Sequence, residues 1–236
     1  KLRYNTCMIR IDIVTLFPEM FVGPFDHSII NRAKNKNLVD IQIHQLRNWS
    51  IDKHHLTDDR PFGGGPGMVL MAEPLFAAVE SLKRENSNNQ SAKVILMSPQ
   101  GSVFSQRKAN ELKGEGHIII ICGRYEGVDQ RFIDELVDEE ISIGDYVLSG
   151  GEVAATVVVD TMVRLIPGAI GKEESLDNES FNDNLLDYPV YTQPAELRGL
   201  KVPDVLLSGH HGQIAKWRQE KAEEKTRRVR PDLIKL

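Results

Sequence analysis

Apolar and polar residues follow two different periods along this chain, and each period predicts a different kind of element. Residues 38–46, LVDIQIHQL, alternate cleanly, as in a strand with one buried face. Residues 93–98 and 117–122 are continuously apolar, which is typical of strands covered on both faces of a parallel sheet. Further strands are predicted at residues 9–17 and 140–143. Helices are predicted at residues 18–36, 73–83, 105–113, 128–137, 151–165 and 211–228. The order of these elements predicts an α/β fold with a mostly parallel sheet.

Two glycine-rich segments directly follow predicted buried strands. They are Cys122-Gly123-Arg124-Tyr125-Glu126-Gly127 and the segment from Ser142 to Glu152, SIGDYVLSGGE. Glycine at the end of a strand lets a ligand lie against bare backbone, because no Cβ stands in the way. Ligands of open α/β sheets bind just beyond the carboxyl ends of the strands. We therefore expect the two loops to line one pocket.

The pattern changes after residue 168. Residues 171–184 are polar, acidic and aperiodic, which indicates a linker or a lid, and we expect a domain boundary near residues 168–180. Beyond it come several prolines and one long helix with many charges. No internal repeat is present. The chain of 236 residues is long enough for one large domain with a small one attached.

Composition excludes some classes of protein. The two cysteines, Cys7 and Cys122, cannot form a disulfide framework or a cysteine zinc site, and they fit a reducing cytoplasm. No apolar stretch reaches membrane-spanning length, and residues 1–7 contain no apolar signal core, so we expect no membrane partner. The net charge is −5, but residues 216–236 carry a net charge of +4. Charge alone favours a solvated helix there, although such a face can contact phosphates.

The usual nucleotide motifs are missing. No Gly-x-Gly-x-x-Gly follows the first strand, and no phosphate loop with Gly-Lys-Ser/Thr occurs. The glycine run in residues 58–68, DDRPFGGGPGM, has no lysine after it. The strand-end loops therefore suit a ligand that is recognised mainly by backbone groups.

These segments resemble the bacterial tRNA (guanine-N1)-methyltransferase family, TrmD, of the SPOUT class. The resemblance rests on motifs that occur in order from about residue 9 to residue 218: LFPEMF at residues 16–21, DDRPFGGGPGM at 58–68, SPQG at 98–101, CGRYEG at 122–127, SIGDYVLSGGE at 142–152, LLDYP at 185–189 and LLSG at 206–209. Each motif alone is weak, but the ordered set is specific.

The resemblance implies a SPOUT-type sheet with a C-terminal trefoil knot, a rare exception to unknotted topology. It implies an obligate homodimer with its active sites at the subunit interface. The implied reaction transfers a methyl group from S-adenosyl-L-methionine to N1 of guanine 37, in the tRNA anticodon loop, and leaves S-adenosyl-L-homocysteine. The implied domains are a cofactor-binding domain with the knot at residues 8–168, a linker or lid at 169–184, and a small helical tRNA-binding domain at 185–236.

By the same resemblance, three loops hold the cofactor. The implied cofactor-binding residues are Met97, Ser98, Pro99, Cys122, Gly123, Tyr125, Glu126, Gly127, Ser142, Ile143, Gly144, Asp145, Tyr146, Val147, Leu148, Gly150 and Gly151. Since this cofactor carries its own activated methyl group, the protein needs to bind it, orient it and manage one proton.

Guanine N1 bears a proton at neutral pH, so a base has to remove it as the methyl group arrives. The family uses an acidic residue just before a Ser-Phe pair, usually aspartate. Here Glu179 occupies that position, and Asp177 is the alternative; both could instead be charges in a solvated lid. Arg164 matches the family arginine before Ile-Pro-Gly and could stabilise negative charge on guanine O6. The same arginine could also cap its own helix.

The expected tRNA contacts lie in two regions. The resemblance brings Asp58, Asp59 and Arg60 near the target base, although aspartates here could simply stabilise a turn. His211, Lys216 and Arg218 would contact the tRNA through the C-terminal helix. Gln193 stands where the family usually has arginine, so one charge toward phosphate is missing. The adjacent histidine pairs are poor metal sites, and no metal site is predicted; magnesium assistance cannot be inferred from the sequence.

Two other functions remain open at this stage. The first is another knotted methyltransferase, acting for example on a ribose hydroxyl. Analysis of the methylated product would distinguish it from the guanine-N1 enzyme. A non-catalytic RNA-binding module would show decayed cofactor loops, whereas the glycines of both loops are intact. Fold alone does not decide among these functions.

Overall fold

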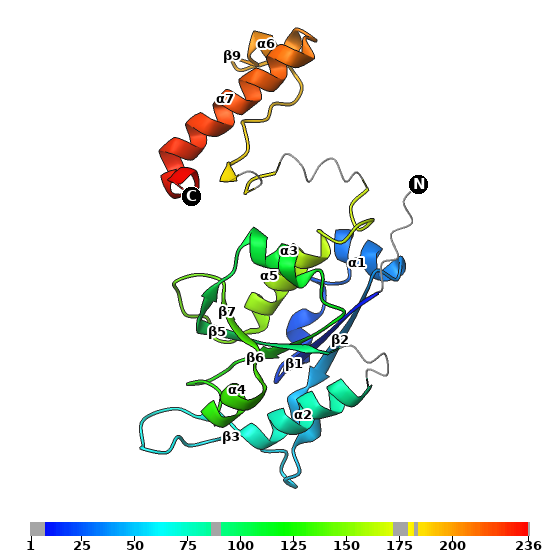
Figure 1. The fold of residues 1–236 in the computed structure, drawn as a ribbon, viewed down its shortest axis with the longest axis vertical. Coiled ribbons are helices and arrows are strands. Elements are labelled where there is room, and N and C mark those ends of the chain that lie inside the picture. The colour runs from blue at the N-terminus through cyan, green and yellow to red at the C-terminus, as the bar shows by residue number, and fades with distance from the viewer. Residues whose placement is uncertain (1–7, 86–90, 172–178, 182–183, 236) are drawn as a thin grey trace. The chain divides into compact units, whose positions relative to one another are not determined.

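The computed structural model describes residues 8–85, 91–171, 179–181 and 184–235. The chain divides into two compact units, residues 1–171 and residues 172–236 (Figure 1).

The larger unit contains a five-stranded parallel sheet in the order β2-β1-β6-β5-β7. The strands are β1 (Ile9–Thr15), β2 (Val39–Gln45), β5 (Lys93–Val103), β6 (His117–Cys122) and β7 (Glu139–Ser142). The helices are α1 (Ser28–Asn35), α2 (Ala72–Glu85), α3 (Gln106–Leu112), α4 (Gln130–Leu136) and α5 (Glu152–Val163). Helices α1, α3 and α5 cover one face of the sheet, and α2 and α4 cover the other (Figure 1). The expected parallel α/β fold is confirmed.

The continuously apolar strand β6 explains why both faces are covered. Ile118 and Ile120 pack in the core beneath α1 and α5, whereas Ile119 and Ile121 pack in the core beneath α2 and α4. All four side chains are buried, because alternate residues of a strand point to opposite faces. The strand with the least polar sequence therefore lies at the centre of the sheet.

One predicted element is wrong. The expected helix at residues 18–36 is instead a 3-10 turn, η1 (Pro18–Phe21), followed by a break and the short helix α1. The break contains Gly23, whose φ of 97° lies outside the helical region and whose N–H donates to the Asp26 carboxylate. Pro24 follows and cannot donate to a helix. The apolar period of residues 18–36 thus comes from two separate elements that pack on the same core.

The other element boundaries differ only slightly from those expected, with one exception. Strand β5 runs on past residue 98 to Val103, because it pairs with β7 a second time beyond a bulge between Met97 and Ser102. Short elements also form in the aperiodic region: η2 (Leu46–Trp49) and the antiparallel pair β3 (Asp58–Asp59) and β4 (Val69–Leu70).

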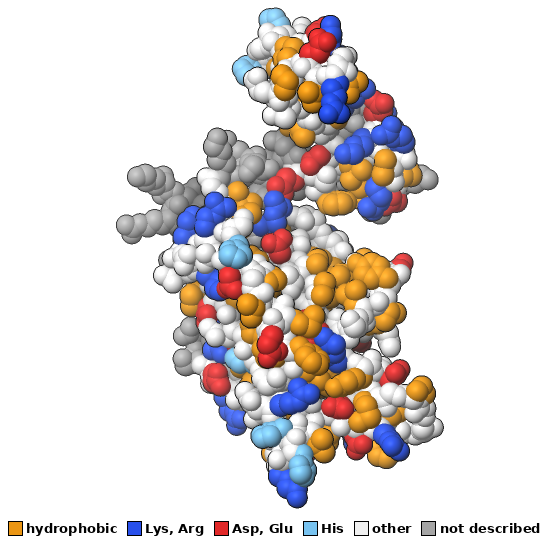
Figure 2. All heavy atoms as spheres, turned by 180° about the vertical axis from the view of Figure 1, so that it is seen from behind, with side chains coloured by type: hydrophobic (Ala, Val, Ile, Leu, Met, Phe, Trp, Pro, Cys, Tyr) orange, Lys and Arg blue, Asp and Glu red, His pale blue; other side chains and the backbone are white. Residues whose placement is uncertain are grey.

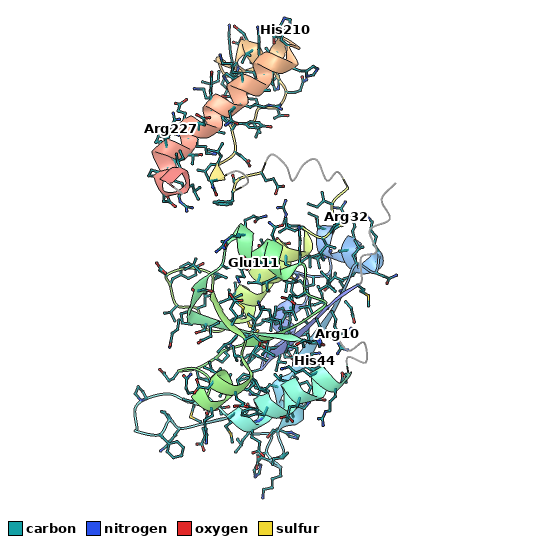
Figure 3. All side chains as sticks on the ribbon, viewed as in Figure 1. Arg10, Arg32, His44, Glu111, His210 and Arg227 are labelled. Carbon is teal, nitrogen blue, oxygen red and sulfur yellow. The ribbon has the colours of Figure 1, made fainter. Side chains whose placement is uncertain are left out.

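The smaller unit is built around one long helix. Its elements are the antiparallel pair β8 (Glu196–Leu197) and β9 (Leu200–Lys201), then α6 (Asp204–Leu207), α7 (His211–Val229) and η5 (Pro231–Lys235). His210 and Arg227 mark opposite ends of α7 (Figure 3). The buried Thr226 hydroxyl accepts a hydrogen bond from the Leu186 N–H, which fixes the incoming chain on the helix. In the described part of the chain, no helix is both long and apolar enough to cross a membrane.

In the larger unit, the fully buried carboxylate of Asp12 joins strands β2, β1 and β6. Asp12 on β1 accepts hydrogen bonds from His117 on β6 at 2.6 Å, from His44 on β2 at 2.7 Å and from Arg10 at 2.7 Å. Arg10 and His44 lie close together on neighbouring strands (Figure 3). Burial opposes ionisation of Asp12, but the hydrogen bonds from His117, His44 and Arg10 outweigh it and hold its pKa well below the ordinary value.

We expect the Asp12→Asn substitution to lower the free energy of unfolding at pH 7 by about 3 kcal/mol, since it leaves buried donors without their charged partner. The lowered pKa of Asp12 stabilises the folded protein fully above about pH 4, the pKa of an aspartate in the unfolded chain. This stabilisation is lost as the pH falls toward the pKa of Asp12 in the folded protein. The difference between the two proteins should therefore shrink below pH 4. Urea denaturation at several pH values measures it, with Asp40→Asn on neighbouring β2 as control. An equal loss for both variants would contradict the assignment.

Candidate active site

A cavity of about 450 Å³ lies beyond the carboxyl ends of β5, β6 and β7. Three loops line it: residues 97–100 within the bulge of β5, residues 123–127 after β6, and residues 142–151 after β7. The two glycine-rich loops named from the sequence therefore line one cavity. A volume of this size lies within the range of small-molecule and cofactor sites.

Most of the residues expected to bind the cofactor line this cavity. They are Met97, Ser98, Pro99, Gly123, Tyr125, Glu126, Gly127, Ser142, Ile143, Gly144, Tyr146, Val147, Leu148, Gly150 and Gly151. Two others are not among the lining residues. Cys122 is buried, and burial raises the pKa of its thiol, so it stays protonated. Asp145 is exposed to solvent.

Some lining residues are not among those expected from the sequence. Gln100 belongs to the Ser-Pro-Gln-Gly motif and could have been found from it. Gln130 and Ile133 line the cavity from α4, where nothing in the local sequence distinguishes them from ordinary helix positions. They reach the cavity because α4 packs against the sheet beside β6.

Backbone contacts fix the two glycine-rich loops against each other. The Gly151 N–H donates to the Gly123 carbonyl at 2.9 Å. A Cβ on Gly151 would lie 2.9 Å from both the Cys122 Cα and the Met97 Cβ, so only glycine fits this crossing. A Cβ on Gly101 would clash with the backbone of Glu140 and Ile141. The chain segments around the cavity thus pass one another in backbone contact.

The loop after β7 is held by its own polar groups. The Ser142 hydroxyl bonds to both the carbonyl and the N–H of Gly144, at 3.0 Å and 3.2 Å. The Tyr146 hydroxyl donates to the Ile143 carbonyl at 3.1 Å. Gly144 has a φ of 151°, and the Tyr146 ring lies where its Cβ would stand. The Tyr146 ring therefore packs over Gly144, and the backbone of the loop faces the cavity.

A buried ion pair fixes the loop after β6 to helix α5. Glu152 is the first residue of α5 and is 1% exposed. Its carboxylate accepts hydrogen bonds from Thr15 on β1 at 2.7 Å and from the Arg124 guanidinium at 3.2 Å. The Arg124 side chain occupies the space that a side chain on Gly150 would need. Its guanidinium covers the Phe17 ring at 4.3 Å from the ring centroid. The carboxylate also lies at the positive N-terminal end of the helix.

The loop that begins with Asp58 and Asp59 is attached to the wall of the cavity. The Glu126 N–H donates to the Met68 carbonyl at 3.0 Å, and the Leu70 N–H donates to the Gly127 carbonyl at 3.0 Å. The Glu126 side chain lies directly over Gly67, where a Cβ would collide with it. Asp59 accepts a hydrogen bond from the Arg60 N–H, and both side chains are exposed.

The expected catalytic residues lie on different units. Arg164 is half-buried at the C-cap of α5, where its N–H donates to the Asp160 carbonyl. Glu179 is half-buried in the smaller unit. Next to it, the Ser180 hydroxyl accepts a hydrogen bond from the Asp187 N–H at 2.9 Å, which fixes the backbone at this position. Asp177 lies outside the described residues.

The expected tRNA contacts of the smaller unit lie on α7. His211 begins the helix and is exposed. Lys216 is exposed and lies 3.9 Å from the Glu220 carboxylate. Arg218 covers the Tyr188 ring at 4.8 Å from its centroid. The structure thus gives Arg218 a packing partner that its sequence position does not indicate.

We expect Gly151→Ala to destabilise the protein by about 2 kcal/mol, because its Cβ would overlap backbone atoms that cannot move aside. Thermal unfolding measures the loss. Gly212→Ala in α7 is the control, since a Cβ there meets nothing within 4 Å and alanine favours helix. Equal melting temperatures for the two variants would contradict the close crossing.

Comparison with known proteins agrees with this geometry. The profile of the tRNA (Guanine-1)-methyltransferase TrmD family matches residues 9–236. Three similar curated relatives are each named tRNA (guanine-N(1)-)-methyltransferase. The one from Dictyoglomus turgidum is 54% identical over 96% of this chain and 90% of its own length; that from Geobacter sulfurreducens is 52% identical over 96% and 91%; that from Brevibacillus brevis is 54% identical over 96% and 91%. With its matching loops lining one cavity, this chain belongs to the tRNA (guanine-1)-methyltransferase TrmD family.

Proposed function

We propose that this protein transfers a methyl group from S-adenosyl-L-methionine to N1 of guanine 37 in tRNA. The observation that carries the proposal is the single cavity formed by the three loops whose sequences match the family. Relatives that share about half of this sequence are named for the guanine-N1 reaction, and they align over nearly the whole chain.

The residues around the cavity fit the proposed cofactor. Its walls are bare backbone at Gly123, Gly127 and Gly151, so a ligand can lie directly against the main chain there. Tyr146 and Leu148 supply apolar surface for an adenine ring and a thioether chain. When bound, S-adenosyl-L-methionine supplies an activated methyl group. The protein's own task is then to orient the guanine and to remove its N1 proton.

We assign the removal of that proton to Glu179. A carboxylate oxygen of Glu179 accepts the N1 proton, which makes the N1 lone pair available to the methyl group. The Ser180–Asp187 hydrogen bond supports this role, because it orders the backbone on which Glu179 stands. Glutamate replaces the usual aspartate and has one more methylene, so the base reaches further from the same backbone position. Asp177 is the alternative base.

Arg164 complements the base. As N1 loses its proton, negative charge develops on guanine O6, and a guanidinium can donate to it as oxyanion donors do. Arg164 is half-buried and stands at the C-cap of α5, so its side chain starts from a hydrogen-bonded helix end. This arrangement divides the work between one proton acceptor and one charge stabiliser.

We also propose that two copies form a homodimer with its active sites at the interface. Exposed apolar side chains stand on η1, just after it, and on the adjacent face of α5: Met20, Val22, Val153 and Val157 are each at least 40% exposed. Hydrophobic side chains gather on one face of the larger unit (Figure 2). Exposed patches of this kind are typical of protein interfaces. We also propose a trefoil knot in the larger unit, with which the close backbone crossings at Gly101 and Gly151 are compatible.

Residues 185–236, which belong to the smaller unit, are proposed to bind the tRNA. Helix α7 presents exposed cations, including Lys216, Arg227 and Arg228, which can contact phosphates in a salt-dependent way. Asp58 and Asp59 offer acceptors for the N–H groups of a guanine base. An unpaired anticodon-loop base costs least to extrude toward the cavity.

We expect Glu179→Gln to lower the rate of methyl transfer by about 100-fold or more, because glutamine cannot accept the N1 proton. Transfer from labelled S-adenosyl-L-methionine to a tRNA transcript with guanine 37 measures it, and nucleoside analysis identifies N1-methylguanine. Glu179→Asp should keep most of the activity. A loss confined to Asp177→Asn would move the base to Asp177. Absence of product from the intact protein would overturn the proposed reaction.

We expect Val157→Glu to convert the dimer into monomers, since the substitution puts a charge into the proposed apolar interface. Sedimentation velocity measures the mass in solution. Val229→Glu on α7 is the control, because Val229 is similarly exposed but belongs to the other unit. A dimer that persists in Val157→Glu would place the interface elsewhere.

A further inference from the structure

Phe62 is the most exposed large apolar side chain of the described residues. Its exposed fraction is 100%, whereas Phe21, Phe25 and Phe132 are buried in the core. Fully exposing an aromatic ring forgoes the stabilisation that burial gives it. Nothing in the fold, the cofactor cavity or the proposed interface explains a phenylalanine at this position.

The local backbone directs this ring outward. The Gly64 N–H donates to the Pro61 carbonyl at 3.3 Å, so residues 61–64 form a turn with Phe62 and Gly63 at its tip. Gly63 has a φ of 88°, which the third position of a type II turn requires. A Cβ on Gly63 or Gly64 would meet nothing within 4 Å, so the glycines serve the path of the chain and not close packing.

The base of this turn is attached to the wall of the cavity. β3 and β4 pair across it, with Asp59 opposite Val69. After the turn, Met68 accepts the Glu126 N–H, and Glu126 itself lines the cavity. In Figure 1 the cyan loop that follows β3 projects outward from the body of the larger unit. Phe62 therefore stands on a short arm that starts at the cofactor cavity.

We propose that Phe62 is a stacking platform for an unpaired nucleobase of the tRNA anticodon loop. This inference rests on the proposed function. A base that reaches the cavity has to leave its stack, and its neighbours then expose their own faces. Aromatic side chains bind such faces without regard to sequence, which suits an arm that follows the backbone of a loop.

The charges beside Phe62 favour a nucleobase over other partners. Asp58 and Asp59 precede it, and a pair of carboxylates disfavours an anionic membrane surface. Their oxygens accept hydrogen bonds from base N–H groups, and the exposed Arg60 can contact a phosphate. One arm thus combines a stacking face, base acceptors and one cation, which is the set of contacts that an unpaired nucleotide needs.

The test compares Phe62→Ala, Phe62→Leu and Phe62→Trp in the intact protein, with a tRNA transcript that carries guanine 37. We expect Phe62→Ala and Phe62→Leu to raise the KM for tRNA by about tenfold. Phe62→Trp should keep the wild-type KM, since only an aromatic face stacks on a base. The dissociation constant for S-adenosyl-L-methionine should stay unchanged. The exposed Ile51→Ala is the matched control and should change neither quantity.

Each other outcome identifies a different role for Phe62. Weaker cofactor binding in Phe62→Ala would mean that the ring covers the cavity, and a change in sedimentation would mean that it contacts a second copy. Full activity of Phe62→Leu would mean that any apolar side chain suffices. All three outcomes overturn the stacking role. They require a wild-type protein that forms N1-methylguanine, so failure of the proposed function is seen separately.

Discussion

The cavity beyond the carboxyl ends of β5, β6 and β7 depends on one buried carboxylate, that of Glu152. Glu152 has lost nearly all contact with water, so its charge requires partners, and Thr15 and Arg124 supply them. These two partners come from β1 and from the loop after β6, whereas Glu152 belongs to α5. A single charge therefore holds together three segments that are far apart in sequence. Because Arg124 reaches it across Gly150, the geometry also explains why a side chain is excluded at that position.

Asp12 follows the same principle in the sheet itself. It accepts hydrogen bonds from β2 and β6 and from its own strand, and all of these groups are polar in an otherwise apolar region. Networks of this kind favour one strand order over its alternatives, because any other pairing would leave a buried charge unsatisfied. The apolar side chains supply the driving force for collapse, and the two carboxylates select which segments come together.

Much of this arrangement could be predicted from local sequence. The apolar run of β6 predicted its residues correctly, and the glycines after β6 and β7 indicated the loops that line the cavity. What could not be predicted depends on distant partners. Nothing near Asp12 in the sequence points to His117, and nothing near Arg124 points to Glu152. The extension of β5 beyond Pro99 likewise needs β7 as a neighbour, and the false helix at residues 18–36 arose because two elements share one core.

The cavity is lined largely by backbone at the positions where chain segments cross. An inhibitor that packs against the bare main chain at Gly123 and Gly151 would contact atoms that no substitution removes. The glycines could be replaced only by residues whose Cβ collides with neighbouring backbone, as at Gly151. Resistance through mutation of these contacts would therefore carry a cost in folding. Substitutions that spare the fold are confined to exposed side chains at the rim, such as Tyr125 and Val147.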